Sequence, residues 1–216
     1  MDIAGKNVVA IVAHPDDETI GCGGFLYKAS AMGATCRVIL PIKRIDRRGI
    51  ENWHSLVSQF HVSCSLLGAD AVLAPLLIDD LYAEQHIPEI VEQIDAHIQW
   101  ADIVLTHWYG DMHQAHQALS RAVELCTRPF RTHKTVLCFE VPTATDQPFQ
   151  QTFSPNCFAE LSEEEVNKKI EAMHYYSTEQ VAGRSAENLR FQMRYRGNQI
   201  GRTYAEAYVI MRHFIV

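Results

Sequence analysis

The chain has 216 residues, 47% of them hydrophobic, and its 19 basic and 26 acidic residues give a formal net charge of −7. This length and composition are typical of a globular protein whose hydrophobic core needs no disulfide crosslinks. The acidic balance argues against a nucleic-acid-binding protein, because no basic surface would compensate the phosphates.

The sequence also indicates in which cellular compartment the protein is expected. Residues 1–7 are polar and lead directly into an apolar run, without the hydrophobic segment of a secretory leader. No apolar run is long enough to span a bilayer. The six cysteines form no C-x-x-C pair, which is typical of buried, reduced thiols. We therefore expect a cytoplasmic protein with no membrane span.

Short apolar runs alternate with amphipathic runs over the first two thirds of the chain. Runs rich in β-branched residues predict strands, and apolar residues at helical spacing predict helices. The expected strands are 8–12, 35–42, 71–77, 102–105 and 135–141. The expected helices between them are 24–32, 51–67, 87–100 and 117–125. This alternation predicts an α/β fold, in which a parallel sheet has helices on both faces.

The last third of the chain has a different pattern. A turn-rich loop is expected over 142–155, followed by a helix over 162–177 that a capping box opens. A second helix is expected over 187–195, and 206–214 is a strand or the end of a helix. We expect one domain over residues 1–216, with a doubly wound core at 1–141 and a C-terminal extension at 142–216 that completes the site.

The first polar cluster, His14-Pro15-Asp16-Asp17-Glu18, directly follows the first expected strand. Open α/β sheets place their ligands at this end of the strands. Zinc takes histidine nitrogen and carboxylate oxygen, so His14 and Asp17 could converge on one ion. Asp16 would then lie beside the metal and could take a proton from an activated water. The alternative is an Asp-rich turn that caps the next helix, but packing alone does not require a histidine with three acids.

A second cluster spans residues 111–116, just after the expected strand 102–105, and can therefore face the first. Either His113 or His116 could join the histidine and aspartate of the first cluster as a third metal ligand. The other could polarise a substrate carbonyl or protonate a leaving group. The alternative is a pair of surface histidines on a loop. His107 lies near this segment and is given no role.

A third, looser set combines Glu140, after the fifth strand, with four arginines of the last third: Arg184, Arg190, Arg194 and Arg196. Arginines can bind an anionic or polar substrate group through two parallel hydrogen bonds. Ion pairs between the C-terminal extension and the sheet are the more common use of such residues.

The His14–Glu18 motif resembles the LmbE-like, or PIG-L-type, metal-dependent de-N-acetylases, which remove acetyl from N-acetylglucosaminyl groups. The resemblance covers nearly the whole chain and implies a Rossmann-like three-layer α/β/α sandwich with a mostly parallel sheet. It implies a zinc ion held by His14, Asp17 and His116, with Asp16 as general base and His113 as electrostatic stabiliser or proton donor. The other segments that resemble the family are Leu105–His107, Asp111–His116, Phe139–Thr145, Phe153–Asn156 and Ala205–Tyr208.

The chain departs from the family pattern in two places. The second metal motif usually reads His-Pro-Asp-His, whereas this chain has Ala115 where the acid normally holds the first histidine. Asp111 is the candidate substitute. After the second strand many members have Thr-Asp-Gly, but this chain has a basic loop over 42–48. Substrate contacts from that loop are therefore expected to differ from those of these members. Because the loop is basic, a more anionic substrate is conceivable.

The expected reaction is zinc-dependent removal of the N-acetyl group from an N-acetylated amino sugar or its conjugate, a small-molecule substrate. Arg48, Asp80 and Arg184 are weaker candidates for contacts with sugar hydroxyls or a phosphate. The leaving amine takes its proton from Asp16 or from His113. Alternatives are a phosphoesterase that uses the same cluster, with Mg²⁺ or Mn²⁺ as the metal, and a non-catalytic sugar-binding relative. Assembly into a homo-oligomer also stays open.

Overall fold

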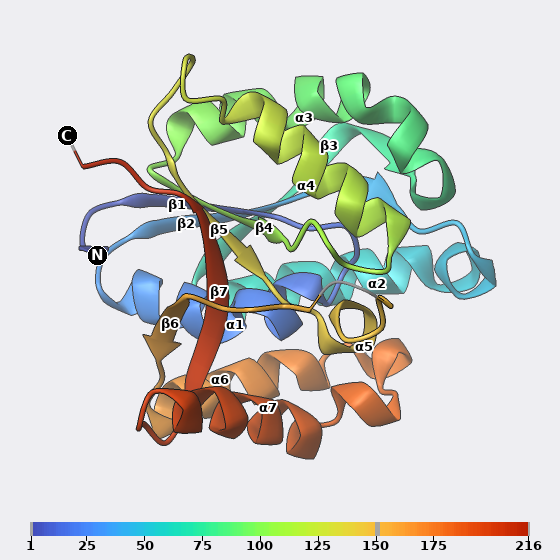
Figure 1. Ribbon diagram of the computed structural model, residues 1–216. Coiled ribbons are helices and arrows are strands. Elements are labelled where there is room, and N and C mark those ends of the chain that lie inside the picture. Colours follow the sequence, from blue (N-terminus) through green and yellow to red (C-terminus); the bar gives the residue numbers. More distant parts are fainter. Residues whose placement is uncertain (1, 150–151, 216) are drawn as a thin grey trace.

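A seven-stranded sheet forms the centre of the molecule (Figure 1), in a computed structural model that describes residues 2–149 and 152–215, without the side chains of residues 47, 48 and 182. The strand order is β3-β2-β1-β4-β5-β7-β6. Strands β1 to β5 pair in parallel, and β7 and β6 add antiparallel pairs at one edge. The strand bounds are β1 Asn7–Ile11, β2 Thr35–Lys43, β3 Ala69–Asp79, β4 Ile103–His107, β5 Thr135–Phe139, β6 Cys157–Glu160 and β7 Ala205–Arg212.

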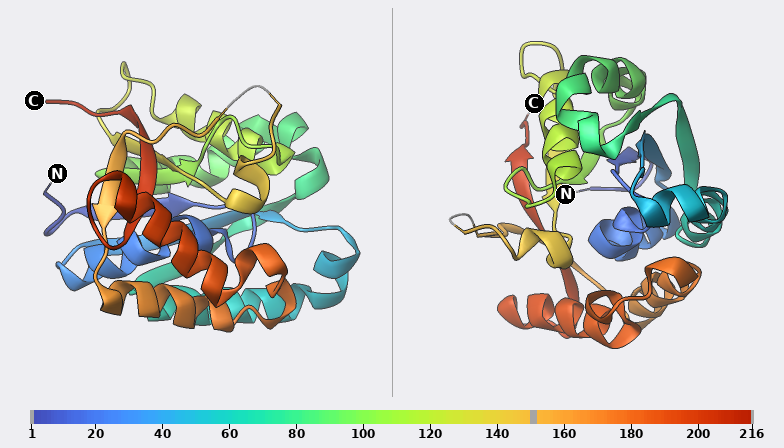
Figure 2. Two further views of the ribbon diagram at one scale, coloured as in Figure 1. Left: turned by 60° about the horizontal axis from the view of Figure 1, so that its bottom comes forward. Right: turned by 90° about the vertical axis from the view of Figure 1, so that its right-hand side faces the viewer.

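Helices cover both faces of the sheet, which confirms the predicted three-layer α/β/α class. One face packs against α1 and α2, and the other against α3 and α4 (Figure 1). Helix α6 packs along α1, and α7 packs along α6 and β7, beyond α1 from the sheet (Figure 2). The helix bounds are α1 Asp17–Ala31, α2 Arg47–Leu66, α3 Ile87–Trp100, α4 Gln114–Cys126, α5 Pro142–Thr145, α6 Glu163–His174 and α7 Ala186–Gln199. Among the described residues, no helix is both long and apolar enough to cross a bilayer.

The strand order reverses direction at β1. The chain passes from β1 outward to β2 and β3, then returns to β4 on the other side of β1. Such a switch point opens a crevice at the carboxyl ends of the two central strands, where open α/β sheets bind ligands. Both polar clusters follow these strands, so the topology brings together segments about 100 residues apart in sequence.

Helix α1 begins earlier than the range 24–32 expected from the sequence. It starts at Asp17 and bends at Cys22, whose backbone φ of −147° is not helical. Gly21 makes close packing possible, because a Cβ atom there would lie 2.2 Å from a ring carbon of Phe139. Gly21 therefore lets this helix approach the sheet.

A buried ion pair stabilises the bend in α1. Glu206 accepts hydrogen bonds from the amides of Gly24 and Phe25, at 2.9 and 2.7 Å. Lys169 donates to the carbonyl of Ile20 at 2.7 Å and to Glu206 at 2.6 Å. The pair thus satisfies backbone groups on both sides of the bend, which the helix cannot pair internally.

We expect Lys169→Met to lower the free energy of unfolding by about 3–5 kcal/mol, because Glu206 would stay buried without its counter-charge. Chemical denaturation measures this loss. Lys168→Met is the matched control: that neighbouring lysine pairs with Glu171 at the surface, and its replacement should leave the denaturation midpoint unchanged. Equal midpoints for both variants would contradict the assignment.

Candidate active site

The loop after β1 presents Asp16 in a strained backbone conformation. Its φ of 109° is the only positive φ of a non-glycine residue among those that the structure describes. Such a conformation costs about 1–3 kcal/mol and is typical of functional sites. Asp16 stands at the N-terminal end of α1, where its side chain makes no capping hydrogen bond. The carboxylate therefore serves something other than the helix.

Glu18 holds this loop in place. Its Oε2 accepts a hydrogen bond from the Asp16 amide at 3.1 Å. Its Oε1 accepts from the hydroxyls of Thr19, Ser63 and Tyr176 at 2.6, 2.9 and 2.6 Å. Burial raises the pKa of Glu18, and these hydrogen bonds oppose the rise. Glu18 is thus a structural residue that positions Asp16.

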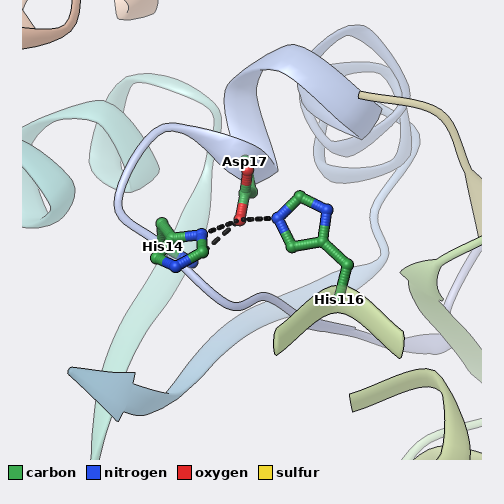
Figure 3. Close-up of side chains that lie close together, drawn as sticks. All are labelled: His14, Asp17 and His116. Atoms are coloured by element: carbon green, nitrogen blue, oxygen red, sulfur yellow. Dashed lines mark hydrogen bonds and ion pairs between the residues drawn. The ribbon is translucent and has the colours of Figure 1, made fainter. Parts of the chain in front are cut away.

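Three imidazoles surround one carboxylate oxygen of Asp17. Oδ2 lies 3.4 Å from Nδ1 of His14, 3.4 Å from Nε2 of His116 and 3.5 Å from Nε2 of His107. Figure 3 shows His14 and His116 approaching Asp17 from opposite sides. Burial opposes ionisation of Asp17, but the charge of His116 holds its pKa well below the usual value. Burial likewise opposes the charged form of His116, and Asp17 raises its pKa to about 9.

The geometry of three of these residues fits a divalent metal ion. His14, Asp17 and His116 each offer one ligand atom, and these atoms lie within 4.8 Å of one another. Ligand atoms about 2.0–2.2 Å from a tetrahedral zinc ion are about 3.3–3.6 Å apart, which matches both 3.4 Å separations. A second group, His14 with Asp80 and His113, meets the same distance criterion, so His14 belongs to both.

Asp111 contacts the ring of His116 and the backbone of His113. Its Oδ2 lies 3.2 Å from Nδ1 of His116 and accepts from the Thr145 hydroxyl at 2.7 Å, while Oδ1 accepts from the His113 amide at 2.8 Å. The ring of His113 is held by another group: its Nδ1 accepts from the Ala115 amide at 3.2 Å. The backbone at Ala115 thus supplies the contact that the sequence suggested Asp111 would replace.

Asp111→Asn should weaken metal binding about 10- to 100-fold, because a carboxylate on the outer nitrogen of a ligating histidine orients the ring and raises its basicity. Competition with a chelating dye measures the dissociation constant. Asp146→Asn removes a charge from the neighbouring α5 loop and is the matched control, for which we expect no change. An Asp111→Asn protein with wild-type metal affinity would contradict the role of this contact.

His107 is a site residue whose role was not predicted from the sequence. It is fully buried at the end of β4, and its ring stacks on His116 with 3.8 Å between centroids. Its Nε2 accepts a hydrogen bond from the Ala13 amide at 3.1 Å. Burial holds the pKa of His107 well below the usual value, so the ring packs as a neutral group. Its place at the carboxyl end of a central strand, like that of His14, was the available signal.

A cavity of about 210 Å³ opens above this cluster, and Asp16 lies in its wall. Arg184 forms an ion pair with Oδ2 of Asp16, donates to the Thr143 hydroxyl at 3.4 Å and lies 3.5 Å from Oε2 of Glu179. Burial raises the pKa of Asp16 to about 8, although the guanidinium of Arg184 opposes the rise. A carboxylate that is costly to ionise is a better proton acceptor than an ordinary one.

His113 contributes a hydrogen-bond donor to the same cavity. It is the N-cap residue of α4, and its Nδ1 accepts the Ala115 amide. Burial lowers the pKa of His113 to about 4. The neutral ring therefore carries its proton on Nε2, the nitrogen available to a bound ligand.

The three candidates for substrate contacts, Asp80, Arg184 and Arg48, lie in different parts of the site region. Asp80 lies with its Oδ2 3.5 Å from Nε2 of His14 and accepts from the Ile45 amide at 3.1 Å. Arg184 lines the cavity. Arg48 is in the first turn of α2, and its side chain lies outside the described part of the structure.

The basic loop and the C-terminal arginines are largely paired with acids. Arg44 lines the cavity but donates to Asp46 and Glu179 at 2.9 and 3.1 Å. Arg196 donates hydrogen bonds to both carboxylate oxygens of Glu140, at 2.7 and 2.5 Å. Arg190 pairs with Glu163 at the surface, between α7 and α6, and Arg194 is exposed. The interpretation as ion pairs between the C-terminal extension and the sheet therefore describes Arg196, which pairs with Glu140, and Arg184, which pairs with Asp16.

Known proteins share both the sequence pattern and the fold. The "Uncharacterized deacetylase YaiS" of Escherichia coli (strain K12) is 27% identical over 175 residues, which cover 78% of this chain and 89% of that protein. The structure of N,N'-diacetylchitobiose deacetylase from Pyrococcus horikoshii, complexed with its inhibitor MPG, matches 96% of this chain and 84% of its own at 20% identity, with a TM-score of 0.74.

The same fold also carries a different reaction. The structure of the 4-carboxy-2-hydroxymuconate hydratase from Pseudomonas putida KT2440 covers 98% of both chains at 16% identity, with a TM-score of 0.69. Structural likeness at this identity therefore shows the fold alone. The family model of the GlcNAc-PI de-N-acetylases (PIG-L) matches residues 9–127, more than half of the chain, and includes both polar clusters. The chain belongs to the PIG-L family of de-N-acetylases.

Proposed function

We propose that this protein is a metal-dependent hydrolase that removes the N-acetyl group from an N-acetylated amino sugar or its conjugate. One observation carries the proposal: the candidate ligands His14, Asp17 and His116 converge beside a cavity that Asp16 and His113 also line. The donor set of two imidazoles and one carboxylate is typical of zinc, so we assign Zn²⁺ as the metal. The de-N-acetylase family model and the relative named as a deacetylase support this reaction class.

A divalent metal at this site supplies a Lewis acid that polarises the acetyl carbonyl and lowers the pKa of a water molecule. Asp16 accepts the proton of the attacking water. Arg184 holds one oxygen of this carboxylate, which fixes the orientation of the other. As the C–N bond breaks, Asp16 returns that proton to the nitrogen, so the products are acetate and the free amine.

His113 stabilises the negative charge that develops on the acetyl oxygen. Its Nδ1 is occupied by the Ala115 amide, so Nε2 carries the proton and donates it in a hydrogen bond. One donor placed in this way typically contributes about 2.7–4 kcal/mol to the stability of the transition state. The helix N-terminus favours the neutral ring, since it disfavours a positive charge nearby.

The test is an assay of the zinc-loaded protein on a panel of N-acetylated sugars, nucleotide sugars and thiol conjugates. We expect equimolar acetate and free amine, which disappear with a chelator and return with added zinc. A parallel panel of sugar phosphates tests the rival function. Phosphate release without acetate would favour a phosphoesterase, and saturable sugar binding without either product would favour a non-catalytic relative. Both results would contradict the proposal.

A further inference from the structure

The second ring nitrogen of His14, Nε2, is buried beside the candidate metal site. The first ring nitrogen, Nδ1, faces Oδ2 of Asp17 at 3.4 Å (Figure 3) and belongs to that site. Within the described part of the chain, Nε2 makes no hydrogen bond of good geometry, although it is buried. A buried polar atom of this kind needs a partner, since water cannot satisfy it. The surroundings of Nε2 therefore indicate what this nitrogen does.

The protonation state of His14 follows from the side on which it faces the site. A neutral imidazole carries one proton, on one of its two nitrogens. Coordination through Nδ1 leaves that proton on Nε2, which must then donate a hydrogen bond. Oδ2 of Asp80 lies 3.5 Å from Nε2, and both side chains are less than one tenth exposed. Asp80 is thus placed to accept the hydrogen bond.

The sheet brings Asp80 to this position. Strand β3 ends at Asp79, which pairs with Lys43 at the end of β2, and Asp80 follows directly as the first residue of the 3-10 helix η1 (Asp80–His86). Oδ1 of Asp80 accepts a hydrogen bond from the Ile45 amide, in the loop after β2, at 3.1 Å. Because one carboxylate oxygen is held by the backbone, the other is directed toward the loop after β1, the strand next to β2.

The other candidate histidine ligand has the same arrangement. Nε2 of His116 faces Asp17, and its outer nitrogen, Nδ1, lies 3.2 Å from Oδ2 of Asp111. The second oxygen of Asp111 also accepts a backbone amide, that of His113. Carboxylates on the outer nitrogens of ligating histidines orient the rings and raise their basicity. The repetition on both sides of the site, from β3 on one side and from the loop after β4 on the other, indicates one shared role.

We propose that Asp80 is a positioning residue of the metal site, which accepts the hydrogen bond of His14 Nε2 and holds this ring toward the ion. The inference rests on the metal site of the proposed function and gives Asp80 a role other than contact with substrate. The rival use of Asp80 is as a ligand of a second ion, together with His14 and His113. Two ions at once would require both nitrogens of His14 to lose their protons, whereas the hydrogen bond to Asp80 requires no proton loss.

Metal affinity tests this role without any substrate. Competition with a chelating dye gives the dissociation constant of zinc for the wild-type, Asp80→Asn and Asp79→Asn proteins. We expect Asp80→Asn to weaken zinc binding about 10- to 100-fold. Asp79→Asn is the matched control, because this neighbouring carboxylate is exposed and makes no capping hydrogen bond. It should leave the dissociation constant unchanged.

Cobalt substitution separates a positioning role from a general loss of stability. The visible absorption bands of bound Co²⁺ depend on the geometry and basicity of its ligands. At saturating Co²⁺ we expect these bands to shift in the Asp80→Asn protein and to stay at the wild-type wavelengths in the Asp79→Asn protein. Weaker zinc binding with an unshifted cobalt spectrum would overturn the proposal, because Asp80 would then support the fold alone.

The remaining outcomes distinguish the rivals. Wild-type zinc affinity in the Asp80→Asn protein would overturn the proposal, and a raised KM would then assign Asp80 to the substrate. Two zinc ions per wild-type chain and one per Asp80→Asn chain would overturn it in favour of a second ion. A wild-type chain that binds no zinc would contradict both the proposed function and this inference. Weakened zinc binding by Asp80→Asn with a shifted cobalt spectrum, in a protein that releases no acetate, would support Asp80 and contradict the reaction alone.

Discussion

Asp16→Asn is expected to lower kcat by about 100-fold or more while the protein keeps its metal. Asparagine preserves the size of the side chain and an oxygen for Arg184, but it cannot accept the proton of the attacking water. A general base typically contributes about 10²–10⁴-fold to the rate. Steady-state assays of acetate release measure kcat, and elemental analysis measures the metal per chain.

The metal measurement is the control in this experiment. Asp16 is outside the group of candidate ligands, so its replacement should not alter the metal content. A variant with normal metal and a kcat within about tenfold of wild type would show that Asp16 is not the base. A variant that lost its metal would instead place Asp16 among the ligands, which also contradicts our assignment.

His116→Ala is expected to abolish stable metal binding and, with it, activity. The substitution removes one of three candidate ligands and leaves Asp17 and Asp111 buried without their shared partner. Loss of a contact to a ligand typically weakens metal binding about 10- to 100-fold. Loss of a ligand itself should therefore weaken metal binding by more than about 100-fold. Elemental analysis after dialysis against a weak chelator measures the bound metal.

An exposed histidine provides the comparison. His174→Ala, at the end of α6, also removes one imidazole and should leave both metal content and activity at the wild-type level. Unchanged metal in the His116→Ala protein would overturn the assignment of this ligand. It would favour the second possible group, in which His14 lies with Asp80 and His113.

Elements with a strong local signal were predicted best. Helix α3 spans Ile87–Trp100, as its apolar spacing and the proline in its first turn indicated. The parallel sheet was predicted from the alternation of apolar strand-like runs with amphipathic helical runs. Strand β6, Cys157–Glu160, was not predicted, because four residues at a sheet edge carry too short a pattern. The segment 206–214 was left open between strand and helix, and it forms β7 because β5 offers it an antiparallel partner.

The meeting of the two polar clusters was predictable, because both directly follow central strands of one sheet. The contacts within the site were not. The partner of Asp111, the hydrogen bond that holds the His113 ring and the stacking of His107 on His116 all depend on side-chain rotamers of separate segments. Spacing along the chain does not contain that information.

The most direct test is a crystal structure of the zinc-loaded protein, with the ion located by anomalous scattering at the zinc edge. We expect one peak about 2.0–2.2 Å from a nitrogen of His14, a nitrogen of His116 and an oxygen of Asp17. A zinc ion bound elsewhere on the chain, with these three side chains in contact only with one another, would contradict it.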